Sequence, residues 1–321
     1  MPRDDSSGSG GVAARLFETL GLHMLERGWL SANQAVFRAI GTTPATVVDT
    51  GFCAHVGQTL ALVDRALAGA PLGRIVNTHL HSDHCGGNAT LQRAFGVPLA
   101  IPPGQADAVQ VWDEAVLSYR DTGQRIERFI AQQRLEPGEP LRAGGRDWQV
   151  IEAPGHDPDA VLLFDPVSGV LIAGDALWED GFGVVFPEIA GEPGFDDVAA
   201  VLDVIERLPV RCVVPGHGAP FGDVAAALVR ARRRLAGFVA DPRRHARHAV
   251  KVLIKYHLME EREQALDALC DWATATPLAA GVWERFDLGP PGSVREGCTV
   301  LVEELVQRGA LERNADRIRD A

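Results

Sequence analysis

The chain has 321 residues, of which 46% are hydrophobic and 23% charged, and its formal net charge is -12 at pH 7. This composition argues against a mostly disordered chain, and no run approaches the ~18 consecutive apolar residues of a membrane-spanning helix. The acidic balance argues against bulk attraction to nucleic acid or anionic lipid. The length predicts about two domains.

Residues 1–11 are rich in glycine and serine and are expected to form a flexible tail. They contain no apolar segment of the kind a signal peptide needs. The five cysteines are scattered and lack Cys-x-x-Cys spacing, so neither a disulfide framework nor an all-cysteine zinc site is expected. We therefore expect a cytoplasmic protein.

Short apolar runs alternate with amphipathic stretches over residues 12–241. The predicted buried strands are residues 45–48, 74–77, 99–101, 148–151, 161–164, 170–172 and 211–214. The predicted helices between them are residues 59–68, 88–95, 196–207 and 222–238. Strands interleaved with helices predict an α/β domain whose sheets are covered by helices.

Two further segments have helical spacing of apolar residues. Over residues 104–135 this spacing predicts a pair of helices packed on the core or, alternatively, a lid over a site. After Asp241 and Pro242, residues 242–321 are predicted to form a smaller domain, helical or winged-helix-like. This region has 12 basic and 13 acidic side chains. A nucleic-acid-binding module would be expected to show a basic face.

The densest group of titratable side chains follows the predicted strand at 74–77. His79, His81, Asp83 and His84 lie within six positions. Imidazole and carboxylate groups are ligands of zinc and similar cations. Alternate residues of an extended loop point the same way, so His79 and His81 can hold one ion, while the turn at Asp83 and His84 can face a second.

Single candidate ligands follow three later strands. His156 follows the strand at 148–151, Asp175 the strand at 170–172, and His217 the strand at 211–214. Each comes directly after a glycine, which lets the backbone approach a crowded centre. Because α/β sheets place their sites at the carboxyl ends of strands, these residues are candidates for the same site.

The motifs His-Leu-His-Ser-Asp-His, Pro-Gly-His, Gly-Asp and Pro-Gly-His-Gly, in this order, resemble those of the metallo-β-lactamase fold superfamily of hydrolases. The resemblance covers about residues 30–235. It includes Asp49, which matches a first motif whose acidic residue supports the site without binding metal. The resemblance implies an αββα sandwich with a dinuclear metal centre between the sheets.

The resemblance also implies a role for each candidate ligand. The first metal would be bound by His79, His81 and His156, the second by Asp83, His84 and His217, and Asp175 would bridge them. Two dications and two carboxylates leave a cationic site that favours bound hydroxide. Asp83 or Asp175 would help to orient this hydroxide or shuttle a proton after bond cleavage. Zinc is the expected metal, with iron or manganese open. In the family a glutamate in place of His81 would suggest a redox di-iron centre, so the histidine points to hydrolysis.

The expected activity is hydrolysis of an ester-type bond, in a thioester, lactone or carboxylic ester, by a metal-bound hydroxide. One alternative is a metal-dependent nuclease or phosphodiesterase with a nucleic-acid-binding C-terminal domain. Another is a non-enzymatic metal-binding protein. β-Lactamases of this fold are exported and generally lack the bridging aspartate, so that activity is not expected. The expected partner is a small-molecule substrate. Neither a membrane nor a nucleic acid is an expected partner, and formation of a homodimer is left as an open alternative.

Two clusters bear on the substrate. Trp178, Phe182 and Phe186 are predicted to line an apolar pocket, or alternatively to be ordinary core aromatics. Basic residues concentrate between positions 230 and 251, where they form either a solvated helix face or a site for an anionic carrier such as glutathione or coenzyme A. These residues are Arg230, Arg232, Arg233, Arg234, Arg243, Arg244, Arg247 and Lys251.

Overall fold

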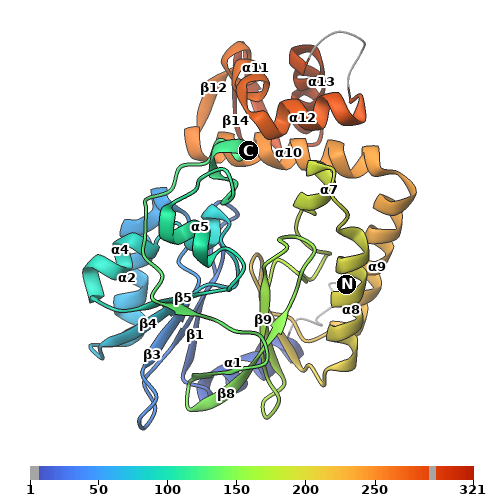
Figure 1. The fold of residues 1–321 in the computed structure, drawn as a ribbon. Helices are drawn as coiled ribbons and strands as arrows, with labels where there is room; N and C mark the ends of the chain where they lie inside the picture. The colour runs from blue at the N-terminus through green and yellow to red at the C-terminus, as the bar shows by residue number, and fades with distance from the viewer. Residues whose placement is uncertain (1–6, 289–293) are drawn as a thin grey trace.

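Two β-sheets lie face to face between layers of helices in the computed structural model of the protein (Figure 1). Helices α2 (Val56–Leu67) and α4 (Asn88–Phe95) cover the outer face of one sheet. Helices α8 (Phe195–Arg207) and α9 (Val224–Ala240) cover the outer face of the other. The αββα sandwich expected from the sequence is confirmed.

Within the described residues, the first sheet has six strands in the order β1-β2-β3-β4-β5-β6. These strands are β1 (Leu22–Leu25), β2 (Gln34–Phe37), β3 (Ala45–Val48), β4 (Leu72–Val76), β5 (Leu99–Ile101) and β6 (Gln133–Arg134). Strands β3 to β6 pair in parallel, and β1 to β3 pair antiparallel. The predicted strands at 45–48, 74–77 and 99–101 are confirmed. β1, β2 and β6 were not predicted, because each is short and includes polar residues.

The second sheet has the order β11-β10-β9-β8-β7. Its strands are β7 (Pro140–Ala143), β8 (Arg146–Glu152), β9 (Val161–Asp165), β10 (Val170–Gly174) and β11 (Cys212–Pro215). Because β9 is antiparallel to both β8 and β10, and β11 is parallel to β10, strands β8, β10 and β11 point the same way. Their carboxyl ends therefore reach the same edge of the sandwich.

Large aromatic side chains pack in the core between the sheets. Trp148 on β8 and Phe37 on β2 are fully buried, and their rings meet edge to face with centroids 5.2 Å apart. All five residues of β9 are buried, since the other sheet covers one face and helices cover the other. Burial of an apolar side chain of this size stabilises the fold by about 1.5–3 kcal/mol relative to exposure.

Helix α8 shows how the outer layers are specified. Its buried residues include Val198, Leu202 and Ile205, which recur at the spacing of one helix face. Asp196 and Asp197 lie in the first turn, where negative charge interacts favourably with the helix dipole. An apolar stripe and an acidic first turn are both local signals, and the helix predicted at 196–207 is confirmed.

The segment 104–135 differs from the predicted pair of helices. It forms the short helices α5 (Ala106–Val111) and α6 (Tyr119–Thr122), followed by β6. Trp112 ends α5 with a φ of 61°, a left-handed conformation that cannot continue an α-helix. The segment instead crosses the surface and brings Thr122 to the wall of the cavity described below.

The structure describes residues 7–288 and 294–321. Helix α1 (Ser7–Thr19) therefore begins inside the stretch expected as a flexible tail, and residues 1–6 lie outside the described residues. The end of α1 and the turn after it pack on the core between the sheets, which holds the helix against the sandwich. The packed side chains are Ala13, Leu16, Phe17 and Leu20.

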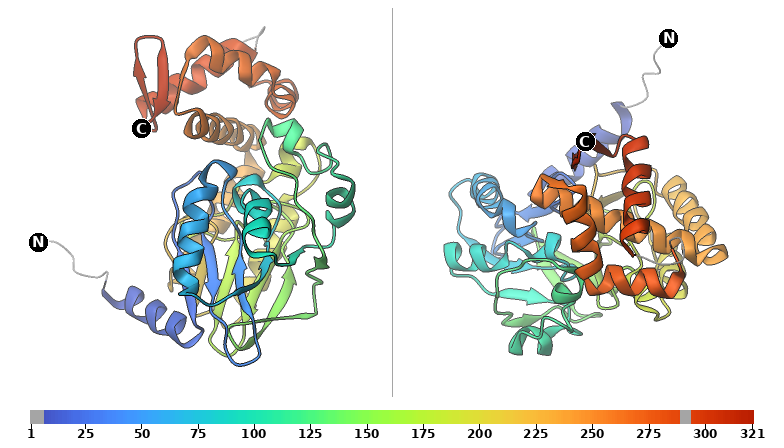
Figure 2. Two further views of the ribbon diagram at one scale, coloured as in Figure 1. Left: turned by 90° about the vertical axis from the view of Figure 1, so that its left-hand side faces the viewer. Right: turned by 90° about the horizontal axis from the view of Figure 1, so that it is seen from above.

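The C-terminal part of the chain lies over one edge of the sandwich (Figure 2). Its helices are α10 (Pro242–Glu261), α11 (Leu266–Ala275), α12 (Pro277–Phe286) and α13 (Val294–Gln307). Its strands β12 (Glu263–Ala265), β13 (Leu311–Asn314) and β14 (Arg317–Asp320) form a small sheet that the sequence did not predict. No helix of the described residues is long and apolar enough to cross a membrane.

The junction between α9 and α10 is a helix break at Asp241. The Asp241 carboxylate accepts a hydrogen bond from the backbone N–H of Arg244 at 3.2 Å, which caps α10. Helix α10 packs against α7 (Phe186–Ala190), and Ile189 of α7 is part of the same apolar cluster as the C-terminal helices. The two parts of the chain therefore share an apolar contact across the break.

Candidate metal centre

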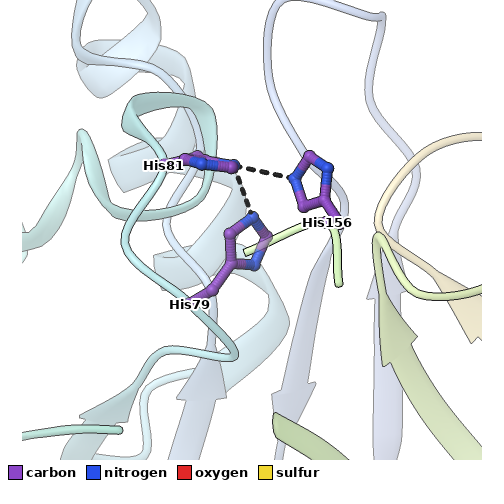
Figure 3. Close-up of side chains that lie close together, drawn as sticks. All are labelled: His79, His81 and His156. Atoms are coloured by element: carbon purple, nitrogen blue, oxygen red, sulfur yellow. Dashed lines mark hydrogen bonds between the residues drawn. The ribbon is translucent and has the colours of Figure 1, made fainter. Parts of the chain in front are cut away.

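Three histidines from facing loops point their ring nitrogens at one another (Figure 3). His79 and His81 lie on the loop after β4, and His156 follows β8 in the other sheet. Nδ1 of His81 lies 3.1 Å from Nε2 of His79 and 2.7 Å from Nε2 of His156. One nitrogen of each ring lies within 4.8 Å of the others, an arrangement that suits a single bound cation.

In His156 and His81, the ring nitrogen that points away from the group faces an oxygen atom. Nδ1 of His156 lies 2.6 Å from the carbonyl oxygen of Val184. Because a carbonyl only accepts, Nδ1 donates and Nε2 presents its lone pair to the group. Nε2 of His81 faces the carboxylate of Asp157 at 3.6 Å. Asp157 was not singled out from the sequence, although it directly follows a predicted ligand.

The three rings are neutral at pH 7. Burial lowers the pKa of His79 well below its usual value, and burial lowers the pKa of His81 and of His156 to about 4. A neutral imidazole keeps the lone pair that a cation needs.

A second group lies beside the first. Asp83 and His84 belong to the short helix α3 (Ser82–Cys85), while Asp175 follows β10 and His217 follows β11. Nε2 of His217 lies 3.0 Å from Oδ2 of Asp83, and Nε2 of His84 lies 3.3 Å from Oδ1 of Asp175. One ligand atom from each of the four residues lies within 4.8 Å of the others.

Asp175 touches both groups. Its Oδ2 lies 3.4 Å from Nε2 of His156 in the first group and 3.8 Å from Nε2 of His217 in the second. A side chain at position 216 would overlap the Asp175 carboxylate, so Gly216 is required for this close packing. Asp175 therefore lies between the groups, where the resemblance places a bridging ligand.

Asp49 supports His84 from behind. Its carboxylate accepts hydrogen bonds from the backbone N–H of Thr78 at 2.9 Å, from the Thr78 hydroxyl at 2.8 Å and from Nδ1 of His84 at 2.8 Å. Nε2 of His84 consequently faces the second group. Asp49 itself does not belong to either ligand group.

The electrostatics of the second group favour a positive charge at its centre. Burial by itself lowers the pKa of His84, but the carboxylates of Asp175 and Asp49 outweigh burial and raise the pKa well above its usual value. Burial by itself raises the pKa of Asp175, but His84 and His217 lower the pKa well below its usual value. The carboxylate is therefore ionised, and its charge stabilises a neighbouring cation or a protonated ring.

The donor set fits two divalent transition-metal ions. The two groups together offer five imidazoles and two carboxylates, the ligands that zinc and similar borderline cations prefer. Nε2 of His84 is buried and lacks a hydrogen-bond partner among the described residues. A buried polar atom without a partner is destabilising, and a cation in the second group would give this nitrogen one.

Members of both groups line a cavity of about 510 Å³: His81 and His156 of the first, and Asp83 and Asp175 of the second. Trp178 and Phe186 line it, as the sequence predicted. Apolar side chains of α10, including Leu253 and Met259, form the facing wall. The cavity therefore combines the candidate ligands with an apolar surface.

Phe182 corrects the third pocket prediction. Its side chain is 1% exposed and belongs to the core beneath α8 and α9, so it does not line the cavity. The guanidinium of Arg234 lies over its ring at 5.6 Å from the centroid. For this residue the alternative interpretation, a core aromatic, is correct, because the chain turns inward between Trp178 and Phe186.

Two aromatic residues beside the ligands were missed by sequence reasoning. The Tyr256 hydroxyl, on α10, lies 3.4 Å from Oδ2 of Asp83 and 3.4 Å from Nε2 of His217. The Trp29 ring stacks on the His217 ring with centroids 5.0 Å apart. No spacing or motif connects positions 29 and 256 with the histidines, so only tertiary contacts could find them.

A second cavity, of about 920 Å³, adjoins the first and is strongly basic. The two share Arg234, His248, Lys251 and Arg308. Among the described residues, six basic and two acidic side chains line the second cavity: Arg234, Arg243, Arg244, Arg247, Lys251, Arg308, Asp241 and Glu304. Burial and the charge of Arg234 lower the pKa of His248 to about 3, so this ring adds no charge.

The basic cluster expected between positions 230 and 251 is thus divided. Arg230 and Arg232 pair with acidic side chains on the outer surface, with N–O distances of 3.1 Å to Asp180 and 2.6 Å to Asp203. Five other members line the second cavity: Arg234, Arg243, Arg244, Arg247 and Lys251. The eighth member, Arg233, is exposed on α9. Each alternative interpretation therefore describes part of the cluster.

Comparison of the sequence with known families gives one clear match. The model of the metallo-beta-lactamase superfamily matches residues 27–217, more than half of the chain. Hydroxyacylglutathione hydrolase of Synechococcus sp. (strain JA-3-3Ab) is 34% identical over 169 residues, which are 52% of this chain and 56% of that protein. The chain thus spans little more than half the length of this relative. Acyl-coenzyme A thioesterase MBLAC2 of Homo sapiens is 26% identical over 61% of this chain and 77% of its own length.

Solved structures resemble the chain over a longer stretch. A metallo-beta-lactamase family protein from Thermus thermophilus has a TM-score of 0.55 at 22% identity, covering 94% of this chain and 99% of that chain. This similarity extends the likeness in fold to the C-terminal helices. The protein TTHA1623, solved in a di-iron-bound form, has a TM-score of 0.51 at 26% identity, covering 65% of this chain and 98% of its own.

Proposed function

The chain belongs to the metallo-beta-lactamase superfamily, and we propose that it is a metal-dependent hydrolase of acyl thioesters. The observation that carries this proposal is the position of the two ligand groups, which meet at Asp175 on the floor of a cavity with an apolar wall and a basic extension. The names of relatives such as hydroxyacylglutathione hydrolase and acyl-coenzyme A thioesterase support the choice of thioesters.

Seven side chains would hold two cations. The first would be held by His79, His81 and His156, the second by Asp83, His84 and His217, with Asp175 between them. Two divalent cations held there would lower the pKa of a bound water and polarise an acyl carbonyl group. Asp83 and Asp175 act as catalytic residues by accepting a hydrogen bond from the attacking water and holding it against the acyl carbon. Asp49 keeps Nε2 of His84 directed inward.

We propose zinc as the metal. The donor set of imidazoles and carboxylates suits zinc, and hydrolysis needs no change in the oxidation state of the metal. TTHA1623 was solved in a di-iron-bound form, so metal analysis of this protein should measure iron as well as zinc. Manganese is the third metal to measure.

The apolar cavity would take the acyl group. Trp178 and Phe186 line it beside the ligands, and Leu253 and Met259 of α10 close the facing wall. An acyl chain bound there removes apolar surface from water and places its carbonyl carbon above the cluster.

The basic cavity would take the anionic part of the thiol carrier. Among the ion pairs of residues 7–288 and 294–321, none includes Arg244 or Arg308. Arg244 and Tyr256 lie twelve residues apart on α10, a separation of about 18 Å along the helix. A long carrier with negative charges at its far end, such as a phosphorylated thiol, fits this length better than a short one.

The test compares purified, metal-analysed protein on four substrate types: acyl thioesters of coenzyme A and glutathione, carboxylic esters and lactones, bis-p-nitrophenyl phosphate, and RNA. We expect about two equivalents of metal and the highest kcat/KM on a thioester. Higher kcat/KM on the phosphodiester or RNA would support the nuclease alternative. Two metal equivalents without turnover on any substrate would support a non-enzymatic protein.

We also propose that residues 12–241 form the hydrolase domain and that residues 242–321 form a winged-helix-like domain. The break at Asp241 supports the boundary, and the combination of α11, α13 and the β13–β14 hairpin supports the winged-helix assignment. The contact of α10 with α7 and the α10 side chains that line the apolar cavity support a C-terminal domain that completes the site.

A further inference from the structure

Helix α10 brings a tyrosine hydroxyl to the edge of the ligand cluster. The Tyr256 hydroxyl lies 3.4 Å from both Oδ2 of Asp83 and Nε2 of His217, and its side chain lines the apolar cavity. It approaches the second group from the cavity side, whereas Asp49 supports that group from behind. The hydroxyl therefore lies where a substrate atom bound at the cluster would come.

Neither of these two contacts is a strong hydrogen bond of the Tyr256 hydroxyl. Hydrogen bonds from O–H to oxygen usually measure about 2.5–3.0 Å, so 3.4 Å is a weak contact. Oδ2 of Asp83 has a closer partner in Nε2 of His217, at 3.0 Å. A tyrosine hydroxyl is protonated at neutral pH and turns freely about its C–O bond. The Tyr256 hydroxyl can therefore donate its hydrogen bond to a substrate oxygen that lies closer to it than Asp83 or His217.

The other tyrosine of the chain shows the contrast. Tyr119 is buried, and its hydroxyl donates to the carbonyl oxygen of Leu80 at 2.8 Å and contacts Sγ of Cys85 at 3.3 Å. Its hydrogen-bonding capacity is used within the fold. Tyr119 is therefore a matched control for Tyr256.

We propose that Tyr256 is a catalytic residue that donates a hydrogen bond to the acyl carbonyl oxygen of the substrate. This role rests on the proposed thioester hydrolysis. In that reaction the water oxygen bonds to the acyl carbon and the carbonyl π pair moves onto its oxygen. The pair then returns, the carbon–sulfur bond breaks, and the sulfur leaves with the bonding pair. One proton of the water ends on sulfur and the other stays on the acid. The carbonyl oxygen is most negative between these steps, when a fixed donor stabilises it most.

The test combines kinetics with binding of two ketone analogues of the thioester. The trifluoromethyl ketone hydrates to a tetrahedral form that resembles the transition state, and the plain methylene ketone resembles the substrate. In Tyr256→Phe we expect kcat to fall about 100-fold with little change in KM. We expect affinity for the trifluoromethyl ketone, measured by calorimetry, to fall by a similar factor, while affinity for the plain ketone and the metal content stay unchanged.

Tyr119→Phe should lower Tm and leave the ratio of the two ketone affinities unchanged. Its kinetics are compared at equal metal content, because Leu80 lies between the ligands His79 and His81. If Tyr256→Phe keeps kcat and trifluoromethyl-ketone affinity within about twofold of wild type, the proposal is wrong. Loss of metal in Tyr256→Phe would also overturn it, because the hydroxyl would then act through Asp83. If the wild-type protein hydrolyses no ester or thioester, the proposed function fails, an outcome distinct from an active wild type with an unaffected variant.

Discussion

At the scale of single residues, Asp49 determines how His84 is presented without joining the ligand groups. Its carboxylate accepts three hydrogen bonds of 2.8–2.9 Å, two from Thr78 and one from Nδ1 of His84, and a longer one from Nδ2 of Asn77 at 3.5 Å. A histidine held through Nδ1 offers its Nε2 lone pair in a fixed direction. Asp49 is therefore expected to affect metal binding at a site that it does not touch.

Replacing Asp49 with asparagine should weaken binding of one cation about 10- to 100-fold. The asparagine amide has one acceptor oxygen and cannot serve all three donors, so His84 loses its fixed orientation. The backbone should tolerate the change, because Asp49 has a φ of 60°, a conformation that asparagine also adopts. Metal retention during titration with a competing chelator measures the effect.

The matched control is Asp165→Asn. Asp165 is buried, and its carboxylate accepts from the backbone N–H groups of Val167 and Ser168 at the turn between β9 and β10. This variant should lower Tm and retain both metals. Equal loss of metal in the two variants would mean that Asp49 contributes only general stability.

At the scale of elements, α10 carries groups on both candidate substrate surfaces. Tyr256 faces the ligand cluster, Lys251 lies where the two cavities meet, and Arg244 lies in the basic cavity. Because one continuous helix fixes their spacing, it would set the length of carrier that reaches both ends.

Removing the unpaired charges should separate carrier binding from chemistry. In the double variant Arg244→Ala and Arg308→Ala we expect KM for a phosphorylated thioester to rise at least about tenfold, since hydrogen bonds to charged groups contribute about 1.5–3 kcal/mol. KM for a short uncharged thioester should not change. Steady-state kinetics at low and high salt measure both effects, and the variant should be less salt-dependent.

Arg232→Ala provides the control on the neighbouring helix. Arg232 lies on α9 but pairs with Asp203 and Glu206 on the outer surface. Its removal should leave KM unchanged for both substrates. An equal rise in KM for the charged and uncharged thioesters in the double variant would contradict the carrier site.

At the scale of the whole molecule, the candidate ligands join the two halves of the sandwich. His79, His81, Asp83 and His84 follow a strand of the first sheet. The remaining three ligands follow strands of the second sheet: His156, Asp175 and His217. Cations held between them would stabilise the folded chain against the unfolded one.

Removal of metal should therefore lower Tm. A ligand present at 100 times its Kd stabilises the fold by about 2.7 kcal/mol, which corresponds to a Tm shift of roughly 4 °C for a protein of this size. Calorimetry of the metal-loaded protein with and without a chelator measures the shift. The same chelator presaturated with zinc is the control, and an unchanged Tm after verified metal removal would contradict the prediction.

Predictions from the sequence succeeded where the signal was local. The apolar runs at 45–48 and 161–164 indicated strands because a strand buried on both faces needs apolar residues at successive positions. The helical spacing over 104–135 was misleading, because the left-handed conformation at Trp112 ends α5 while apolar residues continue beyond it. Phe182 was misplaced for a related reason: the turn that takes it into the core leaves no trace in residue spacing.

The sequence by itself indicated the α/β class and the seven candidate ligands, because each candidate comes shortly after an apolar strand or shares a short loop with another candidate. The αββα sandwich and the role of each ligand were implied by the resemblance of these motifs to a known family. Only the tertiary structure decided that Tyr256 and Trp29 flank the cluster and that Arg244 and Arg308 face one cavity. These residues come from separate elements whose own patterns reflect local helix and loop formation. Their meeting depends on how α10 and the C-terminal helices pack over the edge of the sandwich, and no local pattern encodes that packing.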